Sequence, residues 1–329
     1  MDITILKSKV YNLFTDSTNK DDLILEVFQH QYSNNSLFYE FVKTSRGNLS
    51  PKSIDELTFL PIEFFKSHQI TSSKGKVENV FKSSGTTGNN ASAHHIYDLN
   101  WYQKVARRIF EKEYGIIEDF EILGLLPSYL EKGDSSLVYM VQHFTEISNT
   151  QNPFYLHNHD EFYDRLKVLA AKELPIIVFG VSYALLDFAE KYCSLYNQLI
   201  FIETGGMKGR RKEMIKEELH TRIQRSFPNS SIQSEYGMTE LLSQCYAKDG
   251  IFFNPSDTIQ IELTEVNDPR TKVKPGRTGR INIIDLANIE SCSFIATNDL
   301  GKMNNEGQFQ IMGRVDNARL RGCNLLYFD

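Results

Sequence analysis

The spacing of apolar residues divides the chain into three parts of different character. Over residues 1–80 apolar side chains recur at helical spacing, as at Leu23 and Val27, which predicts a mostly helical segment. From 81 to 250 short apolar runs alternate with helix-like stretches. Over 251–329 short strand-like runs separated by turns take over, which predicts a small β subdomain ending the chain.

The middle part predicts parallel α/β layers. Strands are expected at 122–126, 175–180 and 199–204, where apolar residues form nearly continuous runs. Alternation of strand and helix at this spacing is typical of a parallel sheet covered by helices. The helices expected in this part are 100–114, 137–144, 160–172, 183–193 and 212–226.

Composition and charge narrow the class of protein. Hydrophobic residues make up 41% and charged residues 24% of the 329 residues, which are ordinary globular values. A net charge of −6 gives no basic surface for nucleic acid, so no nucleic-acid partner is expected. No secretory signal and no apolar stretch of about 20 residues is visible, so we expect a cytoplasmic protein without a membrane span. The four cysteines show no zinc spacing and are expected to be free thiols.

A loop of small residues follows a strand predicted at 77–83. Its glycines let the backbone turn sharply, so several N–H groups can face one anion, and its hydroxyls add donors. No Lys-Ser/Thr pair follows, so it is not a Walker loop, and by itself it is either a phosphate loop or a surface turn. The loop comprises Ser83, Ser84, Gly85, Thr86, Thr87 and Gly88.

A second motif, at 234–240, combines an aromatic, a hydroxyl and a carboxyl side chain around a Tyr-Gly turn. Tyr236 can stack on a base, Thr239 can reach a phosphate, and Glu240 can hold Mg²⁺, a hard cation that prefers oxygen ligands. A Tyr-Gly turn is common, so this motif alone is ambiguous.

Two further motifs lie near the end of the chain. Asp299, within 297–301, can accept both hydroxyls of a ribose, or it can form an ordinary Asx turn. Arg314, within 313–322, belongs to a group of three arginines that suits phosphate or ribose contacts, or a solvated basic turn.

The four motifs, in this order, resemble those of the adenylate-forming enzymes: acyl-CoA synthetases, peptide-synthetase adenylation domains and firefly luciferase. The resemblance covers about residues 75–329 and implies the α/β fold of layered sheets flanked by helices found in the large N-terminal domain of these enzymes. It implies catalytic roles for Thr239 and Glu240, with Glu240 as the Mg²⁺ ligand. The ATP site that it implies consists of Ser83, Ser84, Gly85, Thr86, Thr87, Gly88, Gly205, Gly206, Tyr236, Gly237, Asp299 and Arg314.

Among these enzymes the chain looks most like the LuxE-type acyl-protein synthetases. It departs from the wider pattern at Asn89, where a lysine is usual, and at Arg319, and it stops shortly after the last motif, so we expect the usual mobile C-terminal domain to be absent. The resemblance implies activation of a fatty acid, transfer to a cysteine near the C-terminus, and delivery to an acyl reductase or carrier protein. Cys323 sits where the resemblance implies that cysteine, and Arg319 and Arg321 beside it can lower the pKa of its thiol; the alternative is an unreactive thiol in the tail.

Two other interpretations remain open. The chain can be an aryl- or acyl-CoA ligase of the phenylacetate type, which shares the Ser-Ser-Gly-Thr-Thr-Gly loop. It can also be a catalytically degenerate adenylate-binding or scaffold protein that holds an acyl-handling partner. The intact Thr239, Glu240, Asp299 and Arg314 argue against the second of these.

Overall fold

The N-terminal part of the computed structural model is helical, as the apolar spacing predicts. It contains α1 (Ile3–Asn12), α2 (Lys20–Asn34) and α3 (Ser36–Thr44), followed by the short elements η1 (Ile54–Glu56), β1 (Leu60–Pro61) and η2 (Ile62–Lys66). Their apolar faces are buried, with Leu23, Val27 and Phe28 at most 2% exposed.

The structure describes residues 2–15, 19–45, 47–83, 91–127, 133–207, 210–211 and 214–315.

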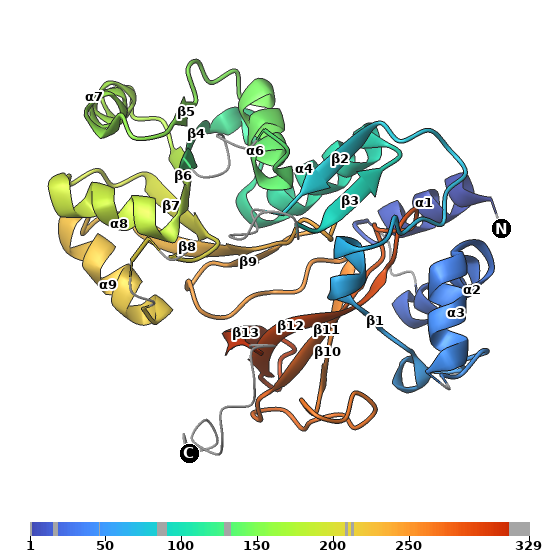
Figure 1. Ribbon diagram of the computed structural model, residues 1–329. Coiled ribbons are helices and arrows are strands. Elements are labelled where there is room, and N and C mark those ends of the chain that lie inside the picture. The colour runs from blue at the N-terminus through green and yellow to red at the C-terminus, as the bar shows by residue number, and fades with distance from the viewer. Residues whose placement is uncertain are drawn as a thin grey trace.

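A largely parallel sheet forms the middle of the molecule, which confirms the predicted α/β layers. Its described strands run in the order β5-β4-β6-β7-β8-β9, and all neighbours are parallel except β8 and β9. Helices α8 and α9 cover one face, and α4 and α6 lie on the other (Figure 1). The strands are β4 (Glu121–Leu125), β5 (Phe154–Tyr155), β6 (Ile176–Val181), β7 (Leu199–Thr204), β8 (Ser231–Tyr236) and β9 (Cys245–Ala247), and the helices are α4 (Leu99–Tyr114), α6 (Ser136–Ile147), α7 (His159–Ala170), α8 (Ser182–Lys191) and α9 (Lys216–Ser226).

A second, mostly antiparallel sheet is built by the C-terminal part. It contains β10 (Ile259–Thr264), β11 (Gly279–Asp285), β12 (Phe294–Met303) and β13 (Phe309–Arg314), and β1 from the N-terminal part joins it in parallel beside β12. A hairpin of β2 (Asn79–Lys82) and β3 (Ala93–Ile96) flanks the small-residue loop.

Among the strands that differ from the sequence prediction, two carry motif residues. β8 was not expected, because its residues are mostly polar and lack the apolar run that marks its neighbours. β12 continues to Met303, so the third motif lies inside a strand with a register shift at Leu300/Gly301 and not in an Asx turn leading into Gly301.

The connection between β11 and β12, residues 286–293, is buried although it forms no strand or helix. Its backbone carbonyls therefore need hydrogen-bond donors from elsewhere. Trp101 Nε1 donates to the carbonyl oxygen of Ala287 at 2.8 Å. Gln31 Nε2 donates to the carbonyl oxygens of Asn288 and Ile289 at 3.0 and 3.1 Å. Side chains from α2 and α4 thus hold this connection in place.

Gln31→Leu is expected to destabilise the protein by about 3 kcal/mol. Leucine is close to glutamine in size but cannot form hydrogen bonds. The carbonyl oxygens of Asn288 and Ile289 would lose the donor Gln31 Nε2, and the N–H of Ser293 would lose the acceptor Gln31 Oε1, which lies at 2.8 Å. All three groups would stay buried without a partner. Urea unfolding measures the change. Gln29→Leu, at an exposed position of the same helix, is the matched control; equal effects of the two substitutions would contradict the role of Gln31.

Candidate functional site

The second motif begins at the carboxyl end of β8, beside the carboxyl end of β7. The two strands are parallel neighbours, so the turn after Tyr236 and the turn at Gly205 lie at the same edge of the sheet. In open α/β sheets this edge is where ligands bind. Gly205 has φ 72°, a left-handed conformation that favours glycine, which explains a glycine directly after β7.

Three motif residues contact one another between the two sheets. Tyr236 Oη donates to Asp299 Oδ2 at 2.9 Å, and Arg314 Nε donates to Asp299 Oδ1 at 3.0 Å. Asp299 and Arg314 are register partners on β12 and β13. Burial raises the pKa of the Tyr236 phenol, so this group stays a neutral donor. The structure therefore brings residues of the second, third and fourth motifs together.

The ring of Tyr236 lies in an aromatic cluster. Its centroid is 5.7 Å from that of Phe253 and 5.5 Å from that of Phe309. The side chain is 8% exposed. Arg314 differs, because its side chain is 71% exposed and only its Nε is tied to Asp299.

The turn that carries Thr239 and Glu240 is held through its backbone. His94 Nδ1 lies 2.8 Å from the carbonyl oxygen of Thr239, and His94 Nε2 lies 3.1 Å from Asn288 Oδ1. Asn288 Nδ2 donates to the carbonyl oxygen of Glu240 at 2.8 Å. Burial lowers the pKa of His94 to about 4, so its ring is neutral near pH 7. Asn288, in the 286–293 connection, carries no sequence signal that would have marked it.

Glu240 presents a buried carboxyl group to this region. Its side chain is 6% exposed, and burial raises its pKa although a hydrogen bond with Ser92 acts in the opposite direction. A hard cation such as Mg²⁺ is often bound by one or two carboxylates plus phosphates and water. A single buried carboxylate fits that mode, and the described residues contain no cluster of three or more metal-ligating side chains.

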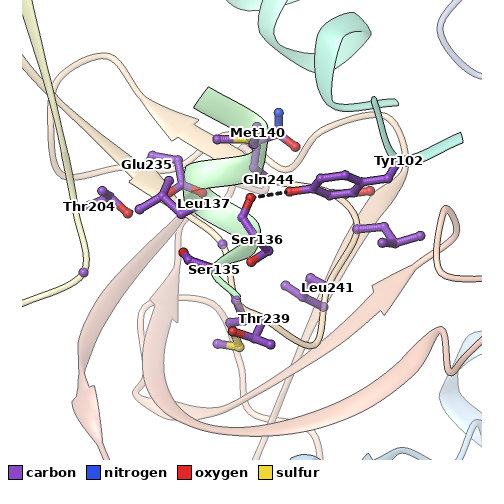
Figure 2. A pocket seen from close by; sticks show the side chains of 15 residues that line it. Tyr102, Ser135, Ser136, Leu137, Met140, Thr204, Glu235, Thr239, Leu241 and Gln244 are labelled. Atoms are coloured by element: carbon purple, nitrogen blue, oxygen red, sulfur yellow. Dashed lines mark hydrogen bonds between the residues drawn. The ribbon is translucent and has the colours of Figure 1, made fainter. Parts of the chain in front are cut away.

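A cavity opens on the other side of β8, against α4 and α6 (Figure 2). It is lined by Glu235, Thr204 and Tyr102 among others. Thr204 Oγ1 donates to Glu235 Oε2 at 2.6 Å. Burial, together with the nearby charge of Glu203, raises the pKa of Glu235 to about 7. Glu235 lies within the second motif, at 234–240, but the sequence assigned no role to it.

Several predicted residues lie elsewhere or outside the described chain. Ser83 closes the base of the small-residue loop, because its Oγ accepts from Ser92 N at 2.9 Å and its N donates to Ser92 O at 3.0 Å. Gly237 lies in the cavity wall, and Gly206 has open space where a Cβ would stand. The residues predicted to act in the small-residue loop and near the C-terminus lie outside the part of the chain that the structure describes: Ser84, Gly85, Thr86, Thr87, Gly88 and Cys323.

A family model described as "Acyl-protein synthetase, LuxE" matches residues 1–328. None of the curated protein sequences compared with the chain matches it. Within the described residues no helix is long and apolar enough to cross a membrane.

Solved structures of acid–CoA ligases share the fold. A 2-hydroxyisobutyryl-CoA ligase in complex with R3-HIB-AMP superposes with a TM-score of 0.65 at 13% identity, over 92% of this chain and 69% of the ligase. ATP-bound MatB from Rhodopseudomonas palustris gives 0.54 at 14% identity, over 74% of this chain and 49% of MatB. A long-chain-fatty-acid-CoA ligase from Archaeoglobus fulgidus gives 0.53 at 15% identity, over 73% and 52%. The matched region thus spans about half the length of MatB, and the predicted fold class is confirmed.

The raised pKa of Glu235 makes stability depend on pH. The Glu235 carboxyl group loses its proton at about pH 4.5 in the unfolded chain and at about pH 7 in the folded chain. Between these two pH values the folded state holds one more proton than the unfolded state. The free energy of unfolding therefore falls as pH rises through this window, by at most about 3 kcal/mol. Glu235→Gln removes the titration, so we expect its stability relative to wild type to increase from pH 5 to pH 7.5 in urea unfolding. If the difference in the free energy of unfolding between Glu235→Gln and wild type does not change with pH, the raised pKa of Glu235 is contradicted.

Proposed function

Because the chain belongs to the LuxE acyl-protein synthetase family, we propose that it activates a carboxylic acid with ATP and passes the acyl group to a protein thiol. The observation that carries this proposal is the contact among Tyr236, Asp299 and Arg314 at the carboxyl end of β8, next to the turn of Thr239 and Glu240. Side chains of three motifs from distant segments converge there, which supports a shared role in binding the nucleotide.

The first step joins the acid to AMP. An oxygen of the acid's carboxylate attacks the α-phosphorus of ATP, the bond from that phosphorus to the β-phosphate oxygen breaks, and pyrophosphate leaves with the bonding electron pair. In this proposal Thr239 donates a hydrogen bond to the α-phosphate as negative charge builds there. Mg²⁺, held by Glu240, would neutralise phosphate charge.

The nucleoside is held between the two sheets in this proposal. Asp299 accepts from Tyr236 and Arg314, yet a carboxylate has about four acceptor positions, so it can also accept from the ribose hydroxyls. The exposed part of Arg314 is available to a phosphate or ribose oxygen. Tyr236 then borders the base, with Gly205 and Gly206 at the neighbouring strand end. We assign the binding of the outer phosphates to the small-residue loop, Ser84 to Gly88.

The second step moves the acyl group. The thiolate of Cys323 attacks the carbonyl carbon of the acyl-adenylate, AMP leaves with the electron pair of the broken bond, and a thioester forms. The acyl group then passes to an acyl reductase or carrier protein. The family match supports this order of steps and a protein acceptor over coenzyme A.

Thr239→Ala is expected to lower acid-dependent exchange of labelled pyrophosphate into ATP about 100-fold, because one donor to the α-phosphate is lost. Thr239→Ser keeps the hydroxyl and is the control, with a loss of at most a few-fold. Equal pyrophosphate exchange by Thr239→Ala and the wild-type protein would contradict a role for Thr239. If the wild-type protein shows no exchange with any acid, the protein binds adenylate without activating acids.

Cys323→Ser is expected to abolish acyl labelling of the protein while leaving pyrophosphate exchange within about two-fold. The thioester needs a thiolate, whereas adenylation does not. The protein is incubated with ATP, Mg²⁺ and labelled acids, then run on denaturing gels with and without hydroxylamine. Cys193→Ser, which removes an exposed thiol, is the control. Acyl-CoA formation without label on the protein would favour a CoA ligase.

A further inference from the structure

We propose that Lys66, the last residue of η2, binds the outer phosphates of ATP and stabilises the negative charge that moves onto pyrophosphate as the acyl-adenylate forms. This inference rests on the proposed function, to which it adds a catalytic residue from the N-terminal part of the chain. The phosphates of ATP carry several negative charges, and pyrophosphate leaves with the electron pair of the broken bond. A site for this reaction therefore needs cations fixed near the phosphates.

The short strand β1 brings η2 beside the proposed nucleotide site. Pro61 pairs in parallel with Ala296 of β12, so the chain leaves β1 where β12 continues toward Asp299. η2 begins directly after Pro61. Asn298 Nδ2 donates to Glu63 Oε1, which ties η2 to the residue next to Asp299. The N-terminal part of the chain thus reaches the third motif.

The geometry of η2 puts Lys66 on the same face of the helix as Glu63. η2 is a 3₁₀ helix, in which side chains three residues apart lie one above the other. Glu63 is directed at Asn298. Lys66 therefore projects from the side of η2 that faces the end of β12.

Phe65 fixes this helix against the turn that carries Thr239 and Glu240. Its side chain is 1% exposed, and its ring lies edge-on to that of His94, with the centroids 5.6 Å apart. His94 Nδ1 lies 2.8 Å from the carbonyl oxygen of Thr239. The packing of Phe65 on His94 therefore holds η2, and with it the backbone of Lys66, at a set distance from the proposed catalytic turn.

The charge of Lys66 acts on Glu240 although the two form no ion pair. Burial has the largest effect on the pKa of Glu240 and raises it, whereas the hydrogen bond with Ser92 and the positive charges of Arg314 and Lys66 act to lower it. Lys66 is exposed and makes no ion pair with a carboxylate in the part of the chain that the structure describes. Space therefore remains between the ammonium and the carboxyl group, and a phosphate whose charge is shared with Mg²⁺ at Glu240 suits it.

The ammonium of Lys66 is better placed to respond to charge on the phosphates than the guanidinium of Arg314. Arg314 Nε already donates to Asp299 at 3.0 Å. A lysine has three donors and no acceptor, so one ammonium can contact several phosphate oxygens. Lys66 keeps its protons and donates hydrogen bonds while the bond from the α-phosphorus to the bridging oxygen breaks. Its role is therefore electrostatic.

The test compares Lys66→Met with the wild-type protein in two assays, because methionine keeps the apolar stem of lysine and removes the charge. We expect kcat for acid-dependent pyrophosphate exchange to fall about 100-fold. In titration calorimetry we expect Kd for ATP to rise about 10-fold and Kd for AMP to change less than about two-fold, because AMP lacks the outer phosphates.

Two further variants serve as controls. Lys66→Arg keeps the charge and should retain at least about a tenth of the wild-type kcat. Lys74→Met removes another exposed lysine of the N-terminal part and should leave kcat and both affinities within about two-fold of wild type. Urea unfolding of each variant should match that of wild type, because Lys66 and Lys74 are both exposed.

The two levels of the proposal fail differently. If Lys66→Met has the kcat of wild type, or if its affinities for ATP and AMP fall together, the role of Lys66 is overturned and acid activation stands. Absence of exchange by the wild-type protein with every acid, from a preparation that unfolds cooperatively, would overturn acid activation and the catalytic role of Lys66. The comparison of ATP with AMP would then still decide whether Lys66 binds phosphates.

Discussion

The constraint on which the rest of the structure depends is the burial of the 286–293 connection between β11 and β12. This segment has no strand or helix to satisfy its backbone, so side chains from distant parts of the chain do so. Gln31 and Trp101 bind it from the N-terminal helices and α4, and Asn288 within it holds the backbone of Glu240 and contacts His94. The connection therefore links the packing of the N-terminal helices to the turn that carries the proposed catalytic residues.

The strand β8 has different surroundings on its two faces. Tyr236 joins Asp299 on the side of the second sheet, whereas Glu235 lines a cavity against α4 and α6. The turn with Thr239 begins where the strand ends, so it lies at the boundary of both regions. The hydroxyl proposed to contact the α-phosphate is thus carried by a turn that borders both the contact of Tyr236 with Asp299 and the cavity.

The sequence predicts much of the fold because buried parallel strands contain long apolar runs. β6 and β7 are of this kind and were found at nearly the expected residues. The sequence did not predict β8, because its buried residues are mostly polar. Their hydrogen-bond partners lie far away in sequence: Ser234 donates to Glu203 at 2.9 Å, and Gln233 accepts from Tyr114. Motif spacing brought Tyr236, Asp299 and Arg314 to attention, but their mutual contact depends on how two sheets pack. Glu235 and Asn288 were missed for the same reason, since their roles arise only from tertiary neighbours.

The dependence of the 286–293 connection on Gln31 has a consequence for biosynthesis. More than 250 residues separate these partners, and β1 pairs with β12 across a similar distance. The N-terminal helices therefore leave the ribosome long before the segments that cover them, with apolar side chains such as Val27 and Phe28 still unprotected. Contacts of such long sequence separation also slow folding. During synthesis this chain should accordingly rely on chaperones that bind exposed apolar helices until its last strands emerge.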